Sequence, residues 1–198
     1  VINPASANTI GGTTPSARNV ISANGSDGVF ISTATAVGNT VQGNLIGTDA
    51  IGGKALKNAA NGVHVFSPGN WIGGMTAAAR NVISGNIGTG ILINGDAATG
   101  TVVQGNFIGV DGSGTQPLAN GAWGIVLANT HGQRIGGSQS SSPVDEGNMG
   151  QSGGDFVQLP LPPTAGNVIA ASGLDGILVN SSHDNVIQGN HIGADYLG

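Results

Sequence analysis

The sequence contains no cysteine and has few aromatic or charged residues. Of its 198 residues, 4% are aromatic, 8% are charged and only five are Lys or Arg. The absence of cysteine excludes disulfide bonds and thiolate metal sites. Five basic residues and a net charge of −5 leave no basic patch for nucleic acid. No apolar run reaches the roughly 18 residues of a membrane-spanning helix, so we expect no membrane insertion.

Glycine and small apolar residues are abundant instead. The chain has 37 glycines, and 38% of its residues are hydrophobic. This apolar fraction with a small net charge excludes disorder driven by charge repulsion. Collagen is excluded as well, because the glycines do not recur at every third position.

Internal repetition organises the whole chain. One phrase occurs three times, as NTVQGNLIGTD at 39–49, TVVQGNFIGVD at 101–111 and NVIQGNHIGAD at 185–195. A second phrase, IGG followed by NVI, alternates with it. Equivalent positions such as Val41 and Val103 lie 62 residues apart. Repeats of this length are typical of solenoids, so they take precedence over local propensity.

Each 62-residue unit divides into two shorter units, and each of these holds three short apolar runs separated by Gly and Asn. The runs are rich in β-branched residues and alternate between two faces, as strands do. No long stretch has a capped helical period. The first strand of each unit is predicted to begin near Val29, Val63, Ile91, Ile125 and Ile177.

A polar column emerges when the units are aligned. Every unit places an asparagine at the bend before its third strand: Asn19, Asn44, Asn81, Asn106, Asn167 and Asn190. Asparagine tolerates the left-handed backbone of tight bends. If the units stack at the strand spacing of about 4.8 Å, each side-chain amide can bond the next. The column therefore predicts a structural asparagine ladder.

The six units predict an all-β fold, a right-handed parallel β-helix of about six coils with three short strands per coil. Coil length varies from 28 to 52 residues, which favours the right-handed form over the more regular left-handed one. We expect one domain over 1–198. Because neither end has a polar capping coil, we expect this domain to be a segment of a longer array. A long insert occupies 138–166.

The sequence resembles a known family at the phrase NLIGTDAIGG, residues 44–53. It is similar to the right-handed parallel β-helix repeats, of pectate-lyase-like fold, in large extracellular bacterial proteins with NxIGTDxxG phrases. The resemblance covers nearly the whole chain and implies a secreted or cell-surface bacterial location. Because the same solenoid carries enzymes, adhesins and passive stalks, the resemblance predicts fold more than activity.

The aspartates of the repeated phrase are candidates for catalysis or calcium binding. The alignment places Asp49, Asp111 and Asp195 in one column with Asn24, Asn86 and Ser172. Asp, Asn and Ser share the ability to cap turns through their own backbone, so we favour turn capping over a metal site. Calcium needs six or more oxygens, and the DGSG loop at Asp111 is the one calcium candidate. No other cofactor is expected.

No catalytic residue is predicted. Arg18 and Arg80 occupy equivalent places without an acidic cluster nearby, so we expect them to bond carbonyls or cover apolar surface. No column offers two adjacent carboxylates, as a glycosidase requires. The four histidines are expected at the surface without metal-ligand spacing: His64, His131, His183 and His191.

Two outward-facing apolar stripes need a cover. The first strands contribute Phe30, His64, Leu92, Val126 and Leu178, and the third strands contribute Val20, Leu45, Val82, Phe107, Val168 and His191. A solvent-facing sheet surface is normally polar. We expect the chain's own inserts at 48–61 and 110–123 to cover these stripes; the alternative is a partner.

Candidate binding residues lie in the long insert and at the two tryptophans: Trp71, Trp123, Asp145, Glu146, Asp155 and Phe156. Long loops on rigid scaffolds often carry specificity. We interpret the chain as a structural or adhesive, non-catalytic segment of an extracellular bacterial repeat protein. The alternative is a β-helix that binds or acts on polysaccharide. The expected partners are an extracellular polysaccharide or another copy, through the open solenoid ends.

Overall fold

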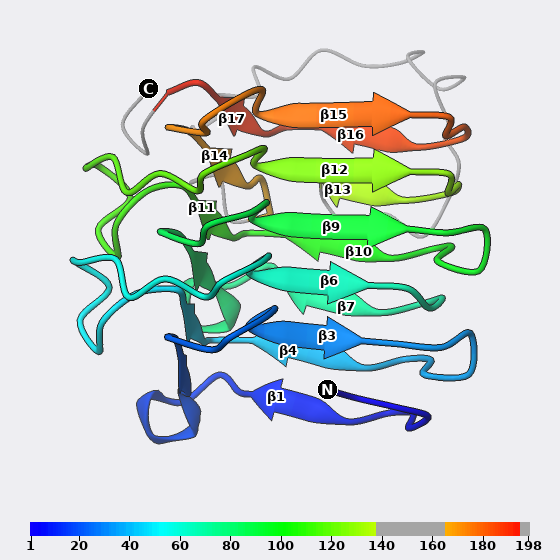
Figure 1. The fold of residues 1–198 in the computed structure, drawn as a ribbon, viewed down its shortest axis with the longest axis horizontal. Coiled ribbons are helices and arrows are strands. Elements are labelled where there is room, and N and C mark those ends of the chain that lie inside the picture. Colours follow the sequence, from blue (N-terminus) through cyan, green and yellow to red (C-terminus); the bar gives the residue numbers. More distant parts are fainter. Residues whose placement is uncertain (138–164, 195–198) are drawn as a thin grey trace, which may run out of the picture.

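The computed structural model describes residues 1–137 and 165–194. They form a right-handed parallel β-helix in which three parallel sheets wind around one core (Figure 1). Each coil contributes one strand to each sheet, in the order first, second and third sheet. In the first coil, Ile2 takes the place of a first strand and makes an isolated parallel bridge to Ile31. The prediction of six coils is thereby confirmed.

The strand bounds follow the repeats. The first sheet contains β3 (Val29–Ile31), β6 (Val63–Val65), β9 (Ile91–Asn94), β12 (Ile125–Ala128) and β15 (Ile177–Asn180). The second contains β1 (Thr9–Gly11), β4 (Thr40–Gln42), β7 (Trp71–Gly73), β10 (Val102–Gln104), β13 (Arg134–Gly136) and β16 (Val186–Gln188). The third contains β2 (Val20–Ile21), β5 (Leu45–Ile46), β8 (Val82–Ile83), β11 (Phe107–Ile108), β14 (Val168–Ile169) and β17 (His191–Ile192). All five predicted strand starts are confirmed.

Inward-facing residues of the strands form a single apolar core. In the second sheet, Ile72 pairs in register with Val41 of the coil before and Val103 of the coil after, and all three are buried. The third sheet repeats this arrangement around Ile83. Since each coil is covered only by its neighbours, the stability of the fold comes from stacking.

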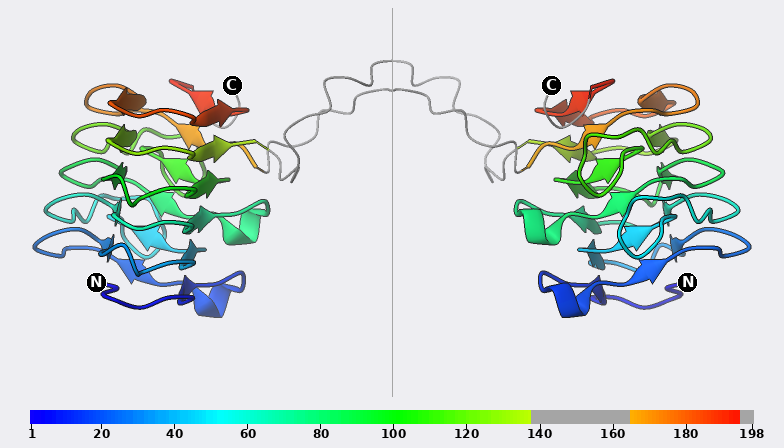
Figure 2. Two further views of the ribbon diagram at one scale, coloured as in Figure 1. Left: turned by 90° about the vertical axis from the view of Figure 1, so that its right-hand side faces the viewer. Right: turned by 90° about the vertical axis from the view of Figure 1, so that its left-hand side faces the viewer.

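Loops explain why the sequence repeats every two coils rather than every coil. After the second strand, coils 1 and 3 carry short 3-10 turns, η1 (Pro15–Ala17) and η2 (Ala77–Ala79), which lie one above the other on one side of the solenoid (Figure 2). After the third strand, coils 2 and 4 carry two hairpin loops (48–57 and 110–119), closed by the bridges Thr48–Ala55 and Val110–Pro117. None of the helices in the described ranges is long and apolar enough to cross a membrane.

The middle of the apolar stripe on the third sheet is covered, but its first residue, Val20, is 47% exposed. Leu45, Val82, Phe107 and Val168 on the outer face of the third sheet are buried, and Val110 of the second hairpin loop packs with them. The outer face of the first sheet is different, because its stripe is half-buried except at the buried Val126. The prediction that the inserts cover both stripes is therefore wrong for the first sheet. Each hairpin loop follows a third strand directly, so the two loops lie over the third sheet.

Candidate functional site

The predicted asparagine ladder is present and continuous. The side-chain amide Nδ2 of each asparagine donates to Oδ1 of the next: Asn19 to Asn44 at 3.0 Å, Asn44 to Asn81 at 3.1 Å, Asn81 to Asn106 at 2.9 Å, Asn106 to Asn167 at 3.0 Å and Asn167 to Asn190 at 2.9 Å. All the bonds run in the same direction. We call this column the first ladder.

Each asparagine of the first ladder also fixes the backbone around it. The backbone N–H of Asn44 donates to Oδ1 of Asn81 at 3.0 Å, and the Nδ2 of Asn44 donates to the carbonyl of Ile10 at 2.9 Å. The same pattern recurs at Asn106, whose Nδ2 donates to the carbonyl of Ile72 at 2.8 Å. These side chains therefore satisfy buried backbone groups at every bend between the second and third sheets.

A second ladder lies after the third strand, and the sequence alignment misassigned it. Asn24, Asn58, Asn86 and Asn120 bond in series, at 2.8, 2.9 and 2.9 Å. The sequence alignment placed Asp49 and Asp111 in this column. They are instead in the hairpin loops, because the chain leaves the coil at Thr48 and Val110 and re-enters it at Asn58 and Asn120. Asp195 lies outside the described residues.

Asp49 and Asp111 cap the hairpin loops, as turn capping predicted. Oδ1 of Asp49 accepts from the N–H of Gly53 at 2.8 Å and of Lys54 at 3.2 Å. The Gly53 N–H is the largest influence on this carboxyl and lowers its pKa below 3.8, while burial opposes the shift. The hairpin loops also touch, since the N–H of Gly112 donates to the carbonyl of Gly52 at 2.9 Å.

The carboxylate of Asp111 is occupied by its own loop. Its Oδ1 accepts from the hydroxyl of Ser113 at 2.6 Å and from the N–H groups of Thr115 and Gln116, both at 3.2 Å. Burial raises the pKa of this carboxyl, but these hydrogen bonds outweigh burial and the net pKa lies below 3.8. Among the residues that the structure describes, no three His, Asp or Glu side chains gather where they could hold a metal ion.

A third ladder precedes the second strand and was not anticipated. Asn8 donates to Asn39 at 2.9 Å and Asn39 to Asn70 at 3.1 Å. At Thr101 the series is interrupted, because its buried hydroxyl has no hydrogen-bond partner. The signal was available in the sequence, since an asparagine opens the phrases at 8, 39 and 70.

The two equivalent arginines have structural roles, as expected. Nε of Arg18 donates to the carbonyl of Gly43 at 3.2 Å, and Nε of Arg80 donates to the carbonyl of Gly105 at 3.0 Å. The guanidinium of Arg80 also lies 4.0 Å from the ring centroid of Phe107 and covers it.

The histidines are more organised than their sequence positions suggest. His64 is half-buried, stacks on Phe30 with ring centroids 4.6 Å apart, and lies 3.3 Å from Asp27 and 2.8 Å from Asn94. His131 and His183 stack at 4.9 Å. The surface position expected for the histidines is wrong for His64, whose side chain is 18% exposed, whereas His183 is exposed.

The candidate sugar-binding tryptophans do not form one site. Trp71 is 36% exposed on β7 in the second sheet, between Thr40 and Val102 of the neighbouring coils. Trp123 precedes β12 of the first sheet, and its indole N–H donates to Asp175 at 3.3 Å. The other candidates, Asp145, Glu146, Asp155 and Phe156, lie outside the described residues.

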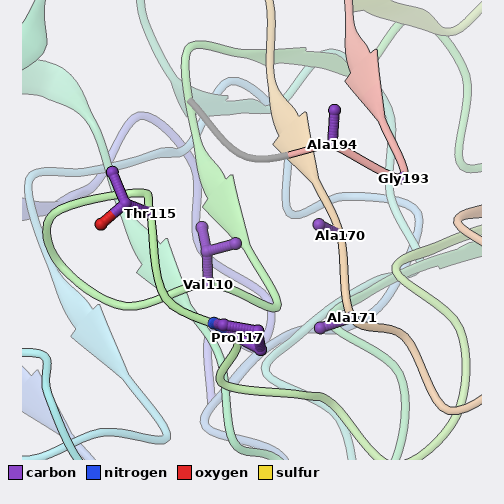
Figure 3. A pocket seen from close by; sticks show the side chains of 7 residues that line it. All are labelled: Val110, Thr115, Pro117, Ala170, Ala171, Gly193 and Ala194. Atoms are coloured by element: carbon purple, nitrogen blue, oxygen red, sulfur yellow. The ribbon is translucent and has the colours of Figure 1, made fainter. Parts of the chain in front are cut away.

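A recess of about 310 Å³ lies between the second hairpin loop and the last two coils (Figure 3). It is lined by Val110, Thr115, Pro117, Ala170, Ala171, Gly193 and Ala194. None of these residues has an ionisable side chain, so the recess offers shape and apolar contact but no acid, base or charge.

Comparisons with known proteins do not identify a relative. No family model, no curated protein and no solved structure matches this chain.

Proposed function

We propose that this chain is a structural or adhesive, non-catalytic segment of a β-helix repeat protein. One observation carries the proposal: the described aspartates and arginines of the repeated phrases are engaged in building the solenoid. Asp49 and Asp111 cap hairpin loops, and Arg18 and Arg80 bond bend carbonyls. A general acid or base must instead be placed to reach a substrate proton.

The proposal includes the cellular location of the protein and the family that it resembles. The NLIGTDAIGG phrase resembles pectate-lyase-like repeats in large extracellular bacterial proteins, which supports a secreted or cell-surface bacterial protein. The composition agrees with a rigid, exposed scaffold. With 8% charged residues, the chain offers few cleavage sites to proteases that recognise a charged side chain, and without cysteine it has no thiol to be oxidised. A solenoid of stacked identical bends presents a long, regular surface to its surroundings.

The test is an activity assay on neutral and acidic polysaccharides, with and without calcium. We expect no new reducing ends and no unsaturated uronate. Turnover that disappears in Asp49→Asn, Asp111→Asn or Arg80→Gln would contradict the proposal, because these residues would then act on substrate. Turnover unaffected by all three would point to a contaminant or to other residues, and Trp71→Ala separates these cases.

Sugar binding without turnover is the second candidate, and Trp71 favours it. An exposed indole on a flat sheet face can stack on a sugar ring, and Arg134 lies two coils further along the same column. A glycan array with wild type, Trp71→Ala and Trp123→Ala tests this. Binding lost only in Trp71→Ala supports a sugar site on the second sheet; a blank array leaves the scaffold role.

Self-association is proposed as a further property of the last described coil. Ile187 and Ile192, which continue the inward columns, are 39% and 50% exposed on the last coil. Another coil of the same kind would bury them. Sedimentation velocity over a range of concentrations should show association that Ile187→Asp and Ile192→Asp weaken. Association that both variants leave unchanged would place the contact elsewhere.

A further inference from the structure

The first hairpin loop is fastened to the coil before it by the backbone of one leucine. The N–H of Leu56 donates to the carbonyl of Gly47 in its own coil at 2.8 Å. The carbonyl of Leu56 accepts from the N–H of Ala23 in coil 1 at 3.1 Å. One residue of the loop therefore bridges two successive coils.

The second hairpin loop repeats this bridge. The N–H of Leu118 donates to the carbonyl of Gly109 at 2.8 Å, and the carbonyl of Leu118 accepts from the N–H of Gly85 in coil 3 at 3.0 Å. Leu56 and Leu118 are equivalent, since they lie 62 residues apart. In both loops a leucine thus satisfies one N–H of the coil before and one glycine carbonyl of its own coil.

Coils 5 and 6 present the same two backbone groups without a leucine between them. Ala171 corresponds to Ala23 and Gly85 and has the same left-handed backbone, with φ 48° against 58° and 72°. Gly193 corresponds to Gly47, because each donates its N–H to an isoleucine carbonyl of the previous coil, at 2.9 and 3.0 Å. Among the described residues, the N–H of Ala171 has no acceptor and the carbonyl of Gly193 has no donor. Both residues line the recess (Figure 3).

Small side chains keep the recess open. In coil 3, the hydroxyl of Ser84 donates to the carbonyl of Val110 at 2.6 Å. The equivalents of these two residues in coils 5 and 6 are Ala170 and Ala194, which are smaller and form no such bond. Pro117 of the second hairpin loop forms a further wall. The walls are therefore apolar around a space of about 310 Å³.

We infer that the recess binds an extended peptide segment that carries a leucine and belongs to a second polypeptide. One residue of this segment donates its N–H to the carbonyl of Gly193 and accepts from the N–H of Ala171, as the leucines of the hairpin loops do in their coils. Backbone hydrogen bonds of this kind supply affinity, and a pocket for the side chain supplies selectivity. Apolar walls favour leucine over a polar side chain. This site is independent of the proposed function, because a catalytic solenoid would present the same recess.

Fluorescence anisotropy of a labelled peptide tests the site in the 198-residue protein. The peptide GGKALKN copies residues 52–58 and contains the leucine of the first hairpin loop. We expect saturable binding of one peptide per chain. A peptide with Leu56→Ser should bind about tenfold more weakly, because it buries less apolar surface. Ala170→Leu in the protein fills the recess and should weaken binding at least as much, whereas Ala34→Leu, at an exposed bend elsewhere, should bind the peptide as the wild type does.

Amide hydrogen exchange gives a second readout that needs no variant. The N–H of Ala171 should exchange freely in the protein alone and become protected when the peptide is bound. The N–H of Ala23 is the matched control, since it already bonds Leu56 and should not change on peptide addition.

No saturable binding at millimolar peptide, or equal binding of the Leu56→Ser peptide, would contradict the site. Protection of the Ala171 N–H before any peptide is added would show that this chain fills the recess itself, which also overturns binding of a second polypeptide. If Ala170→Leu does not fold by circular dichroism, exchange at Ala171 still decides, because an unchanged rate with saturating peptide would place the peptide elsewhere.

Discussion

Replacing Asn106 by leucine should destabilise the solenoid more than any other single change in the first ladder. Asn106 is fully buried in the fourth of six coils. Its Oδ1 accepts from Nδ2 and from the backbone N–H of Asn81, and its Nδ2 donates to the carbonyl of Ile72 and to Oδ1 of Asn167. Leucine removes all of these bonds while the backbone stays buried.

The magnitude follows from the groups left without partners. The backbone N–H of Asn81 loses the one acceptor found for it, which costs about 1–3 kcal/mol for a buried donor. The other groups keep part of their bonding, so each adds roughly the net value of a hydrogen bond, about 0.5–1.5 kcal/mol. Three such groups lose a bond, so we expect a total loss of roughly 2.5–7.5 kcal/mol. For a chain of this size each kcal/mol lowers Tm by about 2–4 °C.

A matched control distinguishes the effect of position in the ladder from the effect of replacing asparagine by leucine. Asn19 begins the same ladder, is exposed, and donates only to Asn44. Asn19→Leu should therefore cost less than about 1 kcal/mol. Asn106→Asp keeps the size and one acceptor, but it sets a buried carboxylate oxygen against the Ile72 carbonyl and Oδ1 of Asn167, so it should cost at least as much as Asn106→Leu. Thermal and urea unfolding of all three variants give the comparison. Equal losses in Asn106→Leu and Asn19→Leu would refute the reasoning, because position in the ladder would then be irrelevant.

Three further predictions concern other parts of the solenoid. Because the pKa values of Asp49 and Asp111 are lowered, these carboxylates stabilise the fold fully above about pH 3.8, and this stabilisation is lost as the pH falls through their folded pKa values. Asp111→Asn should therefore reduce the fall in Tm at acidic pH. A Tm that depends on pH as in the wild type would contradict this prediction. Thr101→Asn should raise stability by about 1 kcal/mol, because it removes a buried unpartnered hydroxyl and offers Oδ1 to Asn70, whereas Thr101→Val tests removal of the hydroxyl alone. Arg80→Lys should lower the free energy of unfolding by about 0.5–2 kcal/mol, because it loses the contact with Phe107. Arg18→Lys should lower it less, because Leu45 stands in place of the aromatic ring there. Equal losses would show that the ring contact contributes nothing.

Local repetition made the fold and the first ladder predictable from the sequence. Asn44, Asn81 and Asn106 precede their third strands at constant spacing, so alignment of the repeats found them. The second ladder was missed because the hairpin loops interrupt that spacing: Asn58 stands nine residues after Asp49, which occupied its column in the alignment. A loop that leaves a coil and re-enters it later shifts the positions that follow, so counting residues between repeats does not reveal it.

Residues far apart in the sequence lie side by side in the structure, and the sequence alone did not predict these pairs. His131 and His183 are 52 residues apart in sequence, with the long insert between them, yet they occupy equivalent places on adjacent coils. Conversely, the two tryptophans lie apart: Trp71 is in β7 of the second sheet, and Trp123 lies before β12 of the first sheet. Which face a side chain occupies depends on its position within a coil, and the insert obscured that position for the last coils.

Amide hydrogen exchange at the ladder residues tests the central claim most directly, namely that the polar side chains of this chain are structural parts of the solenoid. The backbone N–H groups of Asn44, Asn81, Asn106 and Asn167 each donate to a side-chain oxygen on the next coil rather than to a backbone carbonyl. If the ladders hold the bends, these amides should be protected as strongly as the amides of the central strands. Rapid exchange at these four positions, with the strands still protected, would contradict the account.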